Sequence, residues 1–318
     1  MRLLITGAGL IGTAVAAAAA ARGHDATLVD VAPDREFIRR RAPAVSLVVA
    51  CDVTDGAGIA TVVARIAPDA IVHTAALIGS KVDRAPHLAV AVNVAGAAAV
   101  LEAGRRAGVR RIVLVSSLAV YDWPRLPVDR PVHEDSKLGP SSLYGGSKLA
   151  AEDVGRTFAR RDELDVSFLR LAGTYGPGHF RGGSEIGSMV YRCVRTALTR
   201  RRLVAPVALG RREYLHATDA ARAVLLDLTT PLRGQRTMNI GTGRVHSRQQ
   251  FGAALLRALS ELVDMDAALD EPIDRTDPVP PLDIALAERI IGYRPSVCLC
   301  SGLKLVALGM PESGRCPA

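Results

Sequence analysis

Short apolar runs alternate with longer helical patterns through the first half of the chain. The apolar runs lie at residues 3–6, 26–29, 46–49, 70–73, 112–116 and 166–171. They are rich in β-branched residues and leucine and lack polar alternation, which is typical of strands buried on both faces of a parallel sheet. Helical patterns fit between them at residues 11–22, 58–66, 88–107 and 143–161. This order predicts right-handed βαβ units and a Rossmann-type, doubly wound α/β fold.

The pattern changes after about residue 172. Glycine and proline become frequent, as in Tyr175-Gly176-Pro177-Gly178 and the proline-rich residues 277–281, and helical patterns follow near 185–198, 218–228, 247–262 and 284–290. We expect residues 1–172 to form the nucleotide-binding domain. Residues 173–318 are expected to form mainly a smaller substrate-binding lobe at the carboxyl edge of the sheet, where ligands of such folds bind, with segments returning to the first domain.

Composition narrows the class of protein. The 318 residues are 49% hydrophobic and carry a net charge of +8, but the basic clusters are not interleaved with aromatic residues, so we expect solvated helix ends and no nucleic-acid partner. The alanine-rich residues 14–21 are too short to span a bilayer, and the apolar start is too short for a signal peptide, so no membrane association is expected. The five cysteines have irregular spacings without a histidine cluster, which indicates reduced thiols, a cytoplasmic location and no metal site.

A glycine-rich turn directly follows the first predicted strand. Gly7 permits the tight turn, Gly9 lets the backbone approach a pyrophosphate, and Gly12 allows close helix–strand packing. The helix that begins here offers free N–H groups to phosphates. Asp30 ends the second strand, where a carboxylate binds both ribose hydroxyls and repels a 2′-phosphate, so NAD is favoured over NADP. Arg35 keeps NADP open, and Asp30 has the alternative role of capping a turn.

A tyrosine and a lysine recur at helical spacing after the fifth strand. Tyr144 and Lys148 are four residues apart and therefore share a helix face. A nearby ammonium, together with a cationic nicotinamide, lowers the pKa of a tyrosine from its usual value near 10. Ser117 ends the preceding strand and is placed to hold a substrate oxygen while Tyr144 moves its proton. Asp52, after the third strand, either accepts a hydrogen bond from adenine or opens a turn.

Together these pieces resemble the extended short-chain dehydrogenase/reductase family, in its NAD-dependent epimerase/dehydratase branch. The matching motifs span nearly the whole chain in order: the glycine turn, Asp30, Asp52-Val53, His73-Thr74-Ala75-Ala76, Asn93, Ser116-Ser117-Leu118-Ala119-Val120-Tyr121, Tyr144 with Lys148, Leu169-Arg170, Tyr175-Gly176-Pro177-Gly178, Arg212-Glu213-Tyr214-Leu215-His216, Asn239-Ile240-Gly241-Thr242-Gly243 and Gly292-Tyr293-Arg294-Pro295.

The resemblance implies roles for individual residues. Ser117, Tyr144 and Lys148 correspond to the catalytic triad, and Ser117, Gly173 and Arg212 to substrate-binding positions, with Arg212 as a clamp on the diphosphate of a nucleotide sugar. It also implies a homodimer formed through helices near residues 88–107 and 143–161. The residues that correspond to NAD contacts are Gly7, Gly9, Leu10, Ile11, Gly12, Asp30, Asp52, Val53, Ala75, Asn93, Tyr144 and Lys148.

Three departures from the family pattern limit how far the substrate can be assigned. The glycine turn is one residue shorter than the usual TGxxGxxG of this branch. Leu118 and Ala119 stand where dehydratases and decarboxylases carry carboxylates, so those reactions are not expected. Gly173 stands where nucleotide-sugar enzymes carry an asparagine that touches the diphosphate, and glycine here resembles relatives that oxidise small substrates, such as L-threonine 3-dehydrogenase.

Three functions are consistent with these residues. The first is an epimerase of a nucleotide sugar that keeps its NAD, and Arg212 favours it. The second is a net NAD-dependent dehydrogenase or reductase of a small hydroxy compound, and Gly173 favours it. The third is a non-catalytic NAD sensor, against which the intact Ser117, Tyr144 and Lys148 argue. We favour the epimerase.

Overall fold

The structure of the protein is a computed structural model. It describes residues 1–178, 184–201, 211–231, 235–262 and 279–310.

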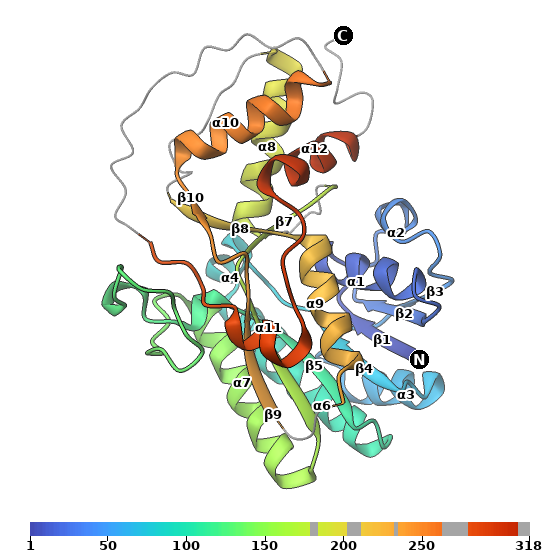
Figure 1. Cartoon of the computed structure of the whole chain (residues 1–318). Helices are drawn as coiled ribbons and strands as arrows, with labels where there is room; N and C mark the ends of the chain where they lie inside the picture. Colours follow the sequence, from blue (N-terminus) through green and yellow to red (C-terminus); the bar gives the residue numbers. More distant parts are fainter. Residues whose placement is uncertain (179–183, 202–210, 232–234, 263–278, 311–318) are drawn as a thin grey trace.

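A seven-stranded parallel sheet forms the centre of the molecule. Its strand order is β3-β2-β1-β4-β5-β6-β9 (Figure 1). The strands are β1 (Arg2–Thr6), β2 (Asp25–Asp30), β3 (Leu47–Ala50), β4 (Ala70–His73), β5 (Arg111–Ser117), β6 (Asp165–Leu171) and β9 (Gln235–Ile240). The predicted fold class and its six strands are confirmed. The seventh strand, β9, comes from the second half of the chain, where the sequence pattern did not indicate a strand.

Helices cover both faces of this sheet. On one face lie α1 (Leu10–Ala20), α9 (Ala217–Thr229) and α11 (Ala285–Ile291). On the other lie α3 (Gly56–Ile66), α6 (Gly96–Arg106) and α7 (Leu143–Asp162). The alanines of α1 pack against those of α9, because small side chains let two helices approach closely.

The smaller lobe has its own core. A three-stranded sheet of β7 (Gly173–Tyr175), β8 (Arg212–His216) and β10 (Val245–His246) packs with α8 (Glu185–Arg200), α10 (Arg248–Ser260) and α12 (Leu299–Leu308). Figure 1 shows this lobe beyond the end of the main sheet. The sequence pattern did not predict α12 or α2 (Arg35–Arg41). Helix α2 is short and buries only Phe37 and Ile38, so it has no clear apolar periodicity.

The helix expected over residues 88–107 is interrupted. It consists of α5 (Pro86–Val90), a π-helical turn (Ala91–Ala95) and α6. The wider turn contains the buried Asn93, and such turns are frequent at functional sites. The continuous stretch Pro86–Arg106 has the length and apolar composition of a membrane span, but a core helix passes the same test, and α6 packs against α3 and α7.

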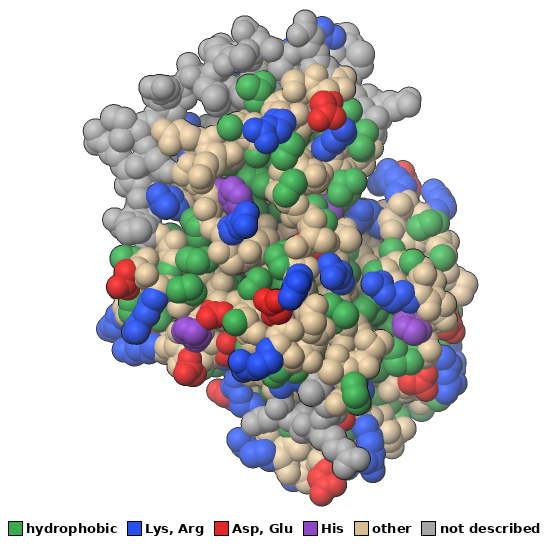
Figure 2. Space-filling model, viewed as in Figure 1, with side chains coloured by type: hydrophobic (Ala, Val, Ile, Leu, Met, Phe, Trp, Pro, Cys, Tyr) green, Lys and Arg blue, Asp and Glu red, His purple; other side chains and the backbone are tan. Residues whose placement is uncertain are grey.

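The charged residues do not form a continuous basic stripe on the face of the molecule that Figure 2 shows, where lysine and arginine side chains alternate with aspartate and glutamate.

Candidate active site

The glycine turn between β1 and α1 is tightly packed. Gly7 has a φ of +88°, a backbone conformation that favours glycine. A Cβ at Gly12 would lie 1.8 Å from the Gly7 carbonyl oxygen, so no larger residue fits there. Thr74, just beyond β4, fixes the turn because its Oγ1 donates to the carbonyl oxygens of Thr6 at 2.7 Å and Gly7 at 3.0 Å. Thr74 had no predicted role, although it stands inside a matching motif.

The start of α1 is suited to hold a pyrophosphate. Its N-cap residue, Gly9, has no side chain to cap the helix, and the first intrahelical bond runs from Thr13 N to Gly9 O. The N–H groups of Leu10, Ile11 and Gly12 therefore precede the regular hydrogen bonding of the helix. The turn therefore fits a dinucleotide.

The two aspartates predicted to bind the nucleotide are both engaged by the backbone. Asp30 accepts hydrogen bonds from Ala8 N at 2.8 Å and Ala32 N at 3.0 Å, which tie the end of β2 to the glycine turn. Asp52 accepts one from Thr54 N at 2.9 Å, as the turn-opening alternative expects. Both carboxylates retain free lone pairs, because a carboxylate accepts about four hydrogen bonds, and their contacts with NAD remain predictions.

Two further predicted NAD contacts, Val53 and Ala75, lie in different places. Val53 is buried and packs on the start of α6, where a Cβ at Gly96 would lie 2.7 Å from its Cγ2. The backbone nitrogen of Ala75 is 2.6 Å from the place of a Cβ on Gly7, so Ala75 borders the glycine turn directly.

Ser117, Tyr144 and Lys148 come from the end of β5 and the first two turns of α7. Ser142 caps this helix by accepting from Gly145 N at 3.1 Å. Lys148 is 5% exposed and its Nζ donates to the carbonyl oxygen of Val115 at 2.8 Å. Ser117 Oγ accepts from Ala119 N at 3.2 Å. Tyr144 interacts with Ser117 through its side chain, and Lys148 bonds to β5 two residues before Ser117, so the three side chains all lie at the end of β5.

Burial shifts the pKa values of both catalytic candidates. It raises the pKa of Tyr144 to about 12, and only the interaction with Ser117 opposes the shift. It lowers the pKa of Lys148 to about 8, against the opposing charge of Glu152. The spacing of Tyr144 and Lys148 predicts that the ammonium lowers the pKa of Tyr144. In the polypeptide alone desolvation is the larger effect, because removing a phenolate from water is costly.

Asn93 acts as a clamp between three segments. It is 1% exposed, and its Oδ1 accepts from Leu77 N at 2.7 Å. Its Nδ2 donates to Leu77 O at 3.0 Å and to Ser147 Oγ at 2.9 Å. Ser147 in turn donates to the carbonyl oxygen of Tyr144 at 2.8 Å. The amide of Asn93 is therefore bonded within the protein, and through Ser147 it holds the start of α7, which carries Tyr144 and Lys148. Ser147 had no predicted role, although it lies between Tyr144 and Lys148.

The two predicted substrate positions of the lobe lie on adjacent strands. Gly173 in β7 pairs with Tyr214 in β8, two residues from Arg212, whose side chain is exposed. A Cβ at Gly173 would lie 2.3 Å from Ile186 Cδ1 and 2.9 Å from the Glu213 carbonyl oxygen. The place that an asparagine would take is therefore filled. The sequence Gly182-Gly183-Ser184 is compatible with a small polar pocket or with a flexible loop, and Gly182 and Gly183 lie outside the described part of the chain.

The lobe reaches over the glycine turn. A Cβ at Gly176, in the stretch after β7, would lie 3.2 Å from Leu10 Cδ1 at the start of α1. The segment that begins with Tyr175 therefore covers the first turn of α1. The candidate catalytic and nucleotide-binding residues and the lobe consequently converge on the carboxyl edge of the sheet.

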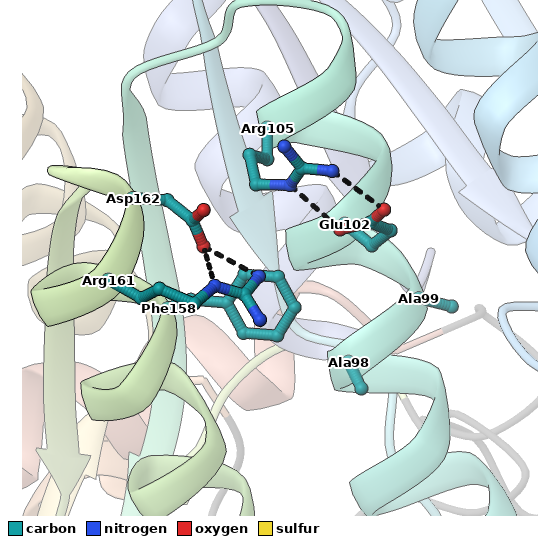
Figure 3. A pocket seen from close by; sticks show the side chains of 7 residues that line it. All are labelled: Ala98, Ala99, Glu102, Arg105, Phe158, Arg161 and Asp162. Carbon is teal, nitrogen blue, oxygen red and sulfur yellow. Dashed lines mark hydrogen bonds and ion pairs between the residues drawn. The ribbon is translucent and has the colours of Figure 1, made fainter.

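A separate hollow lies between α6 and α7 (Figure 3). It has a volume of about 710 Å³ and is lined by Ala98, Ala99, Glu102, Arg105, Phe158, Arg161 and Asp162. Phe158 follows Tyr144 by fourteen residues, about 21 Å along a helix. Its charges are already paired, since Arg105 bonds to Glu102 and Arg161 to Asp162. This hollow is therefore not part of the active site.

The described cysteines form no disulfide bonds. Cys51, Cys193, Cys298 and Cys300 are free, and Cys316 lies outside the described residues. Across the described ranges, no three histidine, cysteine, aspartate or glutamate side chains gather as metal ligands.

Comparisons with known proteins show which family and fold this chain resembles. The model of the "NAD dependent epimerase/dehydratase family" matches residues 3–241. The UDP-glucose 4-epimerase of Mycolicibacterium smegmatis is 30% identical, over 95% of this chain and 96% of that protein. The dTDP-L-rhamnose 4-epimerase of Burkholderia thailandensis is 27% identical over 77% of this chain and 78% of its own length.

A solved structure extends the likeness to three dimensions. The UDP-glucose 4-epimerase of Stenotrophomonas maltophila, with bound NAD and formylated UDP-arabinopyranose, superposes with a TM-score of 0.83. The two chains are 26% identical, and each is covered over 97% of its length.

Proposed function

The chain belongs to the NAD-dependent epimerase/dehydratase family of extended short-chain dehydrogenases/reductases and uses NAD, and from this premise we propose that it epimerises a nucleotide sugar. The observation that carries the proposal is the meeting of Ser117, Tyr144 and Lys148 beside a glycine turn that fits a dinucleotide. Beside Ser117 stand Leu118 and Ala119, neither of which moves protons, so the chemistry is limited to oxidation and reduction at a carbinol carbon.

In the proposed reaction the side chains handle the proton and the substrate oxygen. Ser117 holds the sugar hydroxyl, and Tyr144 Oη takes its proton while the carbon is oxidised. NAD, when bound, would supply the nicotinamide that accepts a hydride and can return it. After the ketone has turned in the site, Tyr144 returns the proton as the second face is reduced. The alcohol is thus re-formed with inverted configuration and no net oxidation.

Lys148 makes this proton transfer feasible. A tyrosine with a pKa of about 12 is almost entirely protonated at neutral pH, so little phenolate is present to act as a base. The ammonium of Lys148, fixed on the same helix face, and the positive charge of an oxidised nicotinamide both favour the phenolate. We expect Asp30 to hold the adenosine ribose, the start of α1 the pyrophosphate, and Arg212 the substrate diphosphate.

A second candidate has one observation in its favour. Ile186 and the Glu213 carbonyl fill the space beside Gly173, so a diphosphate has no asparagine to contact there. This favours net oxidation or reduction of a small hydroxy compound, with release of the reduced cofactor.

Two further proposals concern the whole protein in the cell. We place it in the cytoplasm as a homodimer. The dimer contact is proposed at α6 and α7, whose outer face carries the hollow of Figure 3.

The purified protein provides the test. An epimerase of this kind should keep its NAD through purification. It should convert UDP-glucose to UDP-galactose, or dTDP-glucose to dTDP-galactose. This conversion should cause no lasting rise in absorbance at the wavelength of NADH. A steady rise in NADH absorbance with a small alcohol, and no change in nucleotide sugars, would favour the dehydrogenase or reductase and contradict the epimerase. Chromatography of the sugars and a parallel absorbance trace distinguish the two.

A further inference from the structure

A buried carboxylate lies one helical turn beyond Lys148. Glu152 is 1% exposed, and residues four apart share a helix face. Its Oε1 accepts a hydrogen bond from Ser116 Oγ at 2.5 Å, while Lys148 Nζ donates to Val115 O at 2.8 Å. Two successive turns of α7 are therefore tied to two successive residues of β5, directly before Ser117.

Two arginines hold this carboxylate in place. Arg170 of β6 donates to it from Nε at 3.0 Å and from Nη2 at 2.7 Å, and Arg156 donates from Nη2 at 2.6 Å. Arg170 is 1% exposed and also donates to Tyr121 Oη at 3.0 Å and to Glu134 O at 2.8 Å. Because both carboxylate oxygens are engaged, Glu152 has a fixed position and a fixed charge.

We propose that Glu152 is a positioning residue of the active site, which sets the register of α7 against the end of β5 and keeps Lys148 protonated. The proposal rests on the role assigned above to Lys148. It adds a fourth member to the Ser117–Tyr144–Lys148 group, one that acts through Lys148 and does not touch the substrate.

The charges around Lys148 assign this role to Glu152. His73 faces it from β4 and is neutral at pH 7, because burial and the charge of Lys148 lower the pKa of His73 to about 3. Tyr144 on α7 is neutral as well, and Asn93 in the π-helical turn does not ionise. Within the described residues, Glu152 supplies the charge that opposes the fall in the pKa of Lys148 on burial.

The four lysines of the chain make a direct test feasible. They are Lys81, Lys137, Lys148 and Lys304. In protein labelled with ¹³C at lysine Cε, four signals titrate with pH, and the signal missing from Lys148→Arg is assigned to Lys148. We expect Glu152→Gln to lower the pKa of Lys148 by about one unit. Asp153→Asn is the matched control, since it removes the neighbouring, exposed carboxylate of α7 and should leave this titration unchanged.

Further variants separate charge from structure. Glu152→Asp keeps the charge and should leave the pKa of Lys148 within about 0.3 units of wild type. An unchanged titration in Glu152→Gln, or an equal drop in Glu152→Asp, overturns the proposal. Should Glu152→Gln not fold, Ser116→Ala tests the register, because it removes one hydrogen bond and no charge. It should reduce kcat at least threefold at an unchanged pKa of Lys148, and wild-type turnover would contradict the role.

The titration needs no substrate, so its outcome is independent of the proposed reaction. A shifted Lys148 signal in a protein that converts no nucleotide sugar would support the role of Glu152 and contradict the epimerase. An active epimerase in which Glu152→Gln leaves the Lys148 signal unshifted would support the proposed reaction and contradict the role of Glu152.

Discussion

The hydroxyl of Tyr144 is subject to two opposing effects. Burial raises its pKa to about 12, and its interaction with Ser117 opposes this shift. In the proposed reaction, the ammonium of Lys148 and a bound oxidised nicotinamide would also favour the phenolate. Spacing on a helix identifies such a pair in a sequence, but the balance between burial and charge depends on side chains from β5 and α7.

Replacing Tyr144 by phenylalanine removes the proposed proton carrier and little else. We expect Tyr144→Phe to reduce turnover by at least 10²-fold, in the range typical of a lost general acid or base. The affinity for NAD should stay within threefold of wild type, because the pyrophosphate and ribose contacts are elsewhere. Steady-state kinetics and calorimetric titration with NAD check this. Turnover near wild type would remove Tyr144 from the mechanism.

The packing around Gly173 determines whether a larger residue is tolerated at this position. Because Ile186 and the Glu213 carbonyl leave no room for a Cβ, Gly173→Ala is expected to cost about 1–3 kcal/mol of unfolding free energy. Gly146→Ala is the control, since nothing lies within 4 Å of a Cβ there. An alanine inside α7 should stabilise by about 0.5–1 kcal/mol. Urea denaturation compares the two, and equal midpoints would contradict the steric argument.

At the scale of elements, the π-helical turn is the least predictable part of the site. Periodicity indicated a continuous helix, because a π turn changes the hydrogen bonding without breaking the apolar pattern. Its consequence is chemical. Asn93 lies in this turn and ties the segment at Leu77 to α7 through Ser147.

Loss of the Asn93 amide should therefore affect both stability and catalysis. Asn93→Ala leaves Leu77 N and O without this partner, which costs about 1–3 kcal/mol for a buried polar group. A double-mutant cycle with Ser147→Ala measures the coupling by denaturant unfolding, and kcat is measured in parallel. Additive free energies, together with unchanged kcat, would show that Asn93 does not position α7.

At the scale of the whole molecule, the lobe completes the site. Strand β9 pairs with β6 in the main sheet, although it comes after β7 and β8 of the lobe. The chain thus passes between the lobe and the sheet more than once, which fixes the lobe over the carboxyl edge and brings Gly176 onto Leu10.

The proposed dimer gives a prediction at the same scale. Ala98 lines the hollow between α6 and α7, and Ala98→Arg places a bulky charge on the proposed contact. We expect this variant to elute as a monomer in size-exclusion chromatography with light scattering, because an unpaired buried charge is costly at an interface. Thr61→Arg on the exposed side of α3 should remain a dimer. A monomeric wild type would contradict the proposal.

The sequence alone determined much of this protein. Apolar runs buried on both faces leave a parallel sheet as the main solution, and the glycine turn and the spacing of Tyr144 and Lys148 are local features that short segments encode. Tertiary structure decided what depends on contacts between distant segments. The place of β9, the clamp by Asn93, the space beside Gly173 and the carboxylate of Glu152 against Ser116 all involve residues far apart in the chain, and no local pattern encodes such distances.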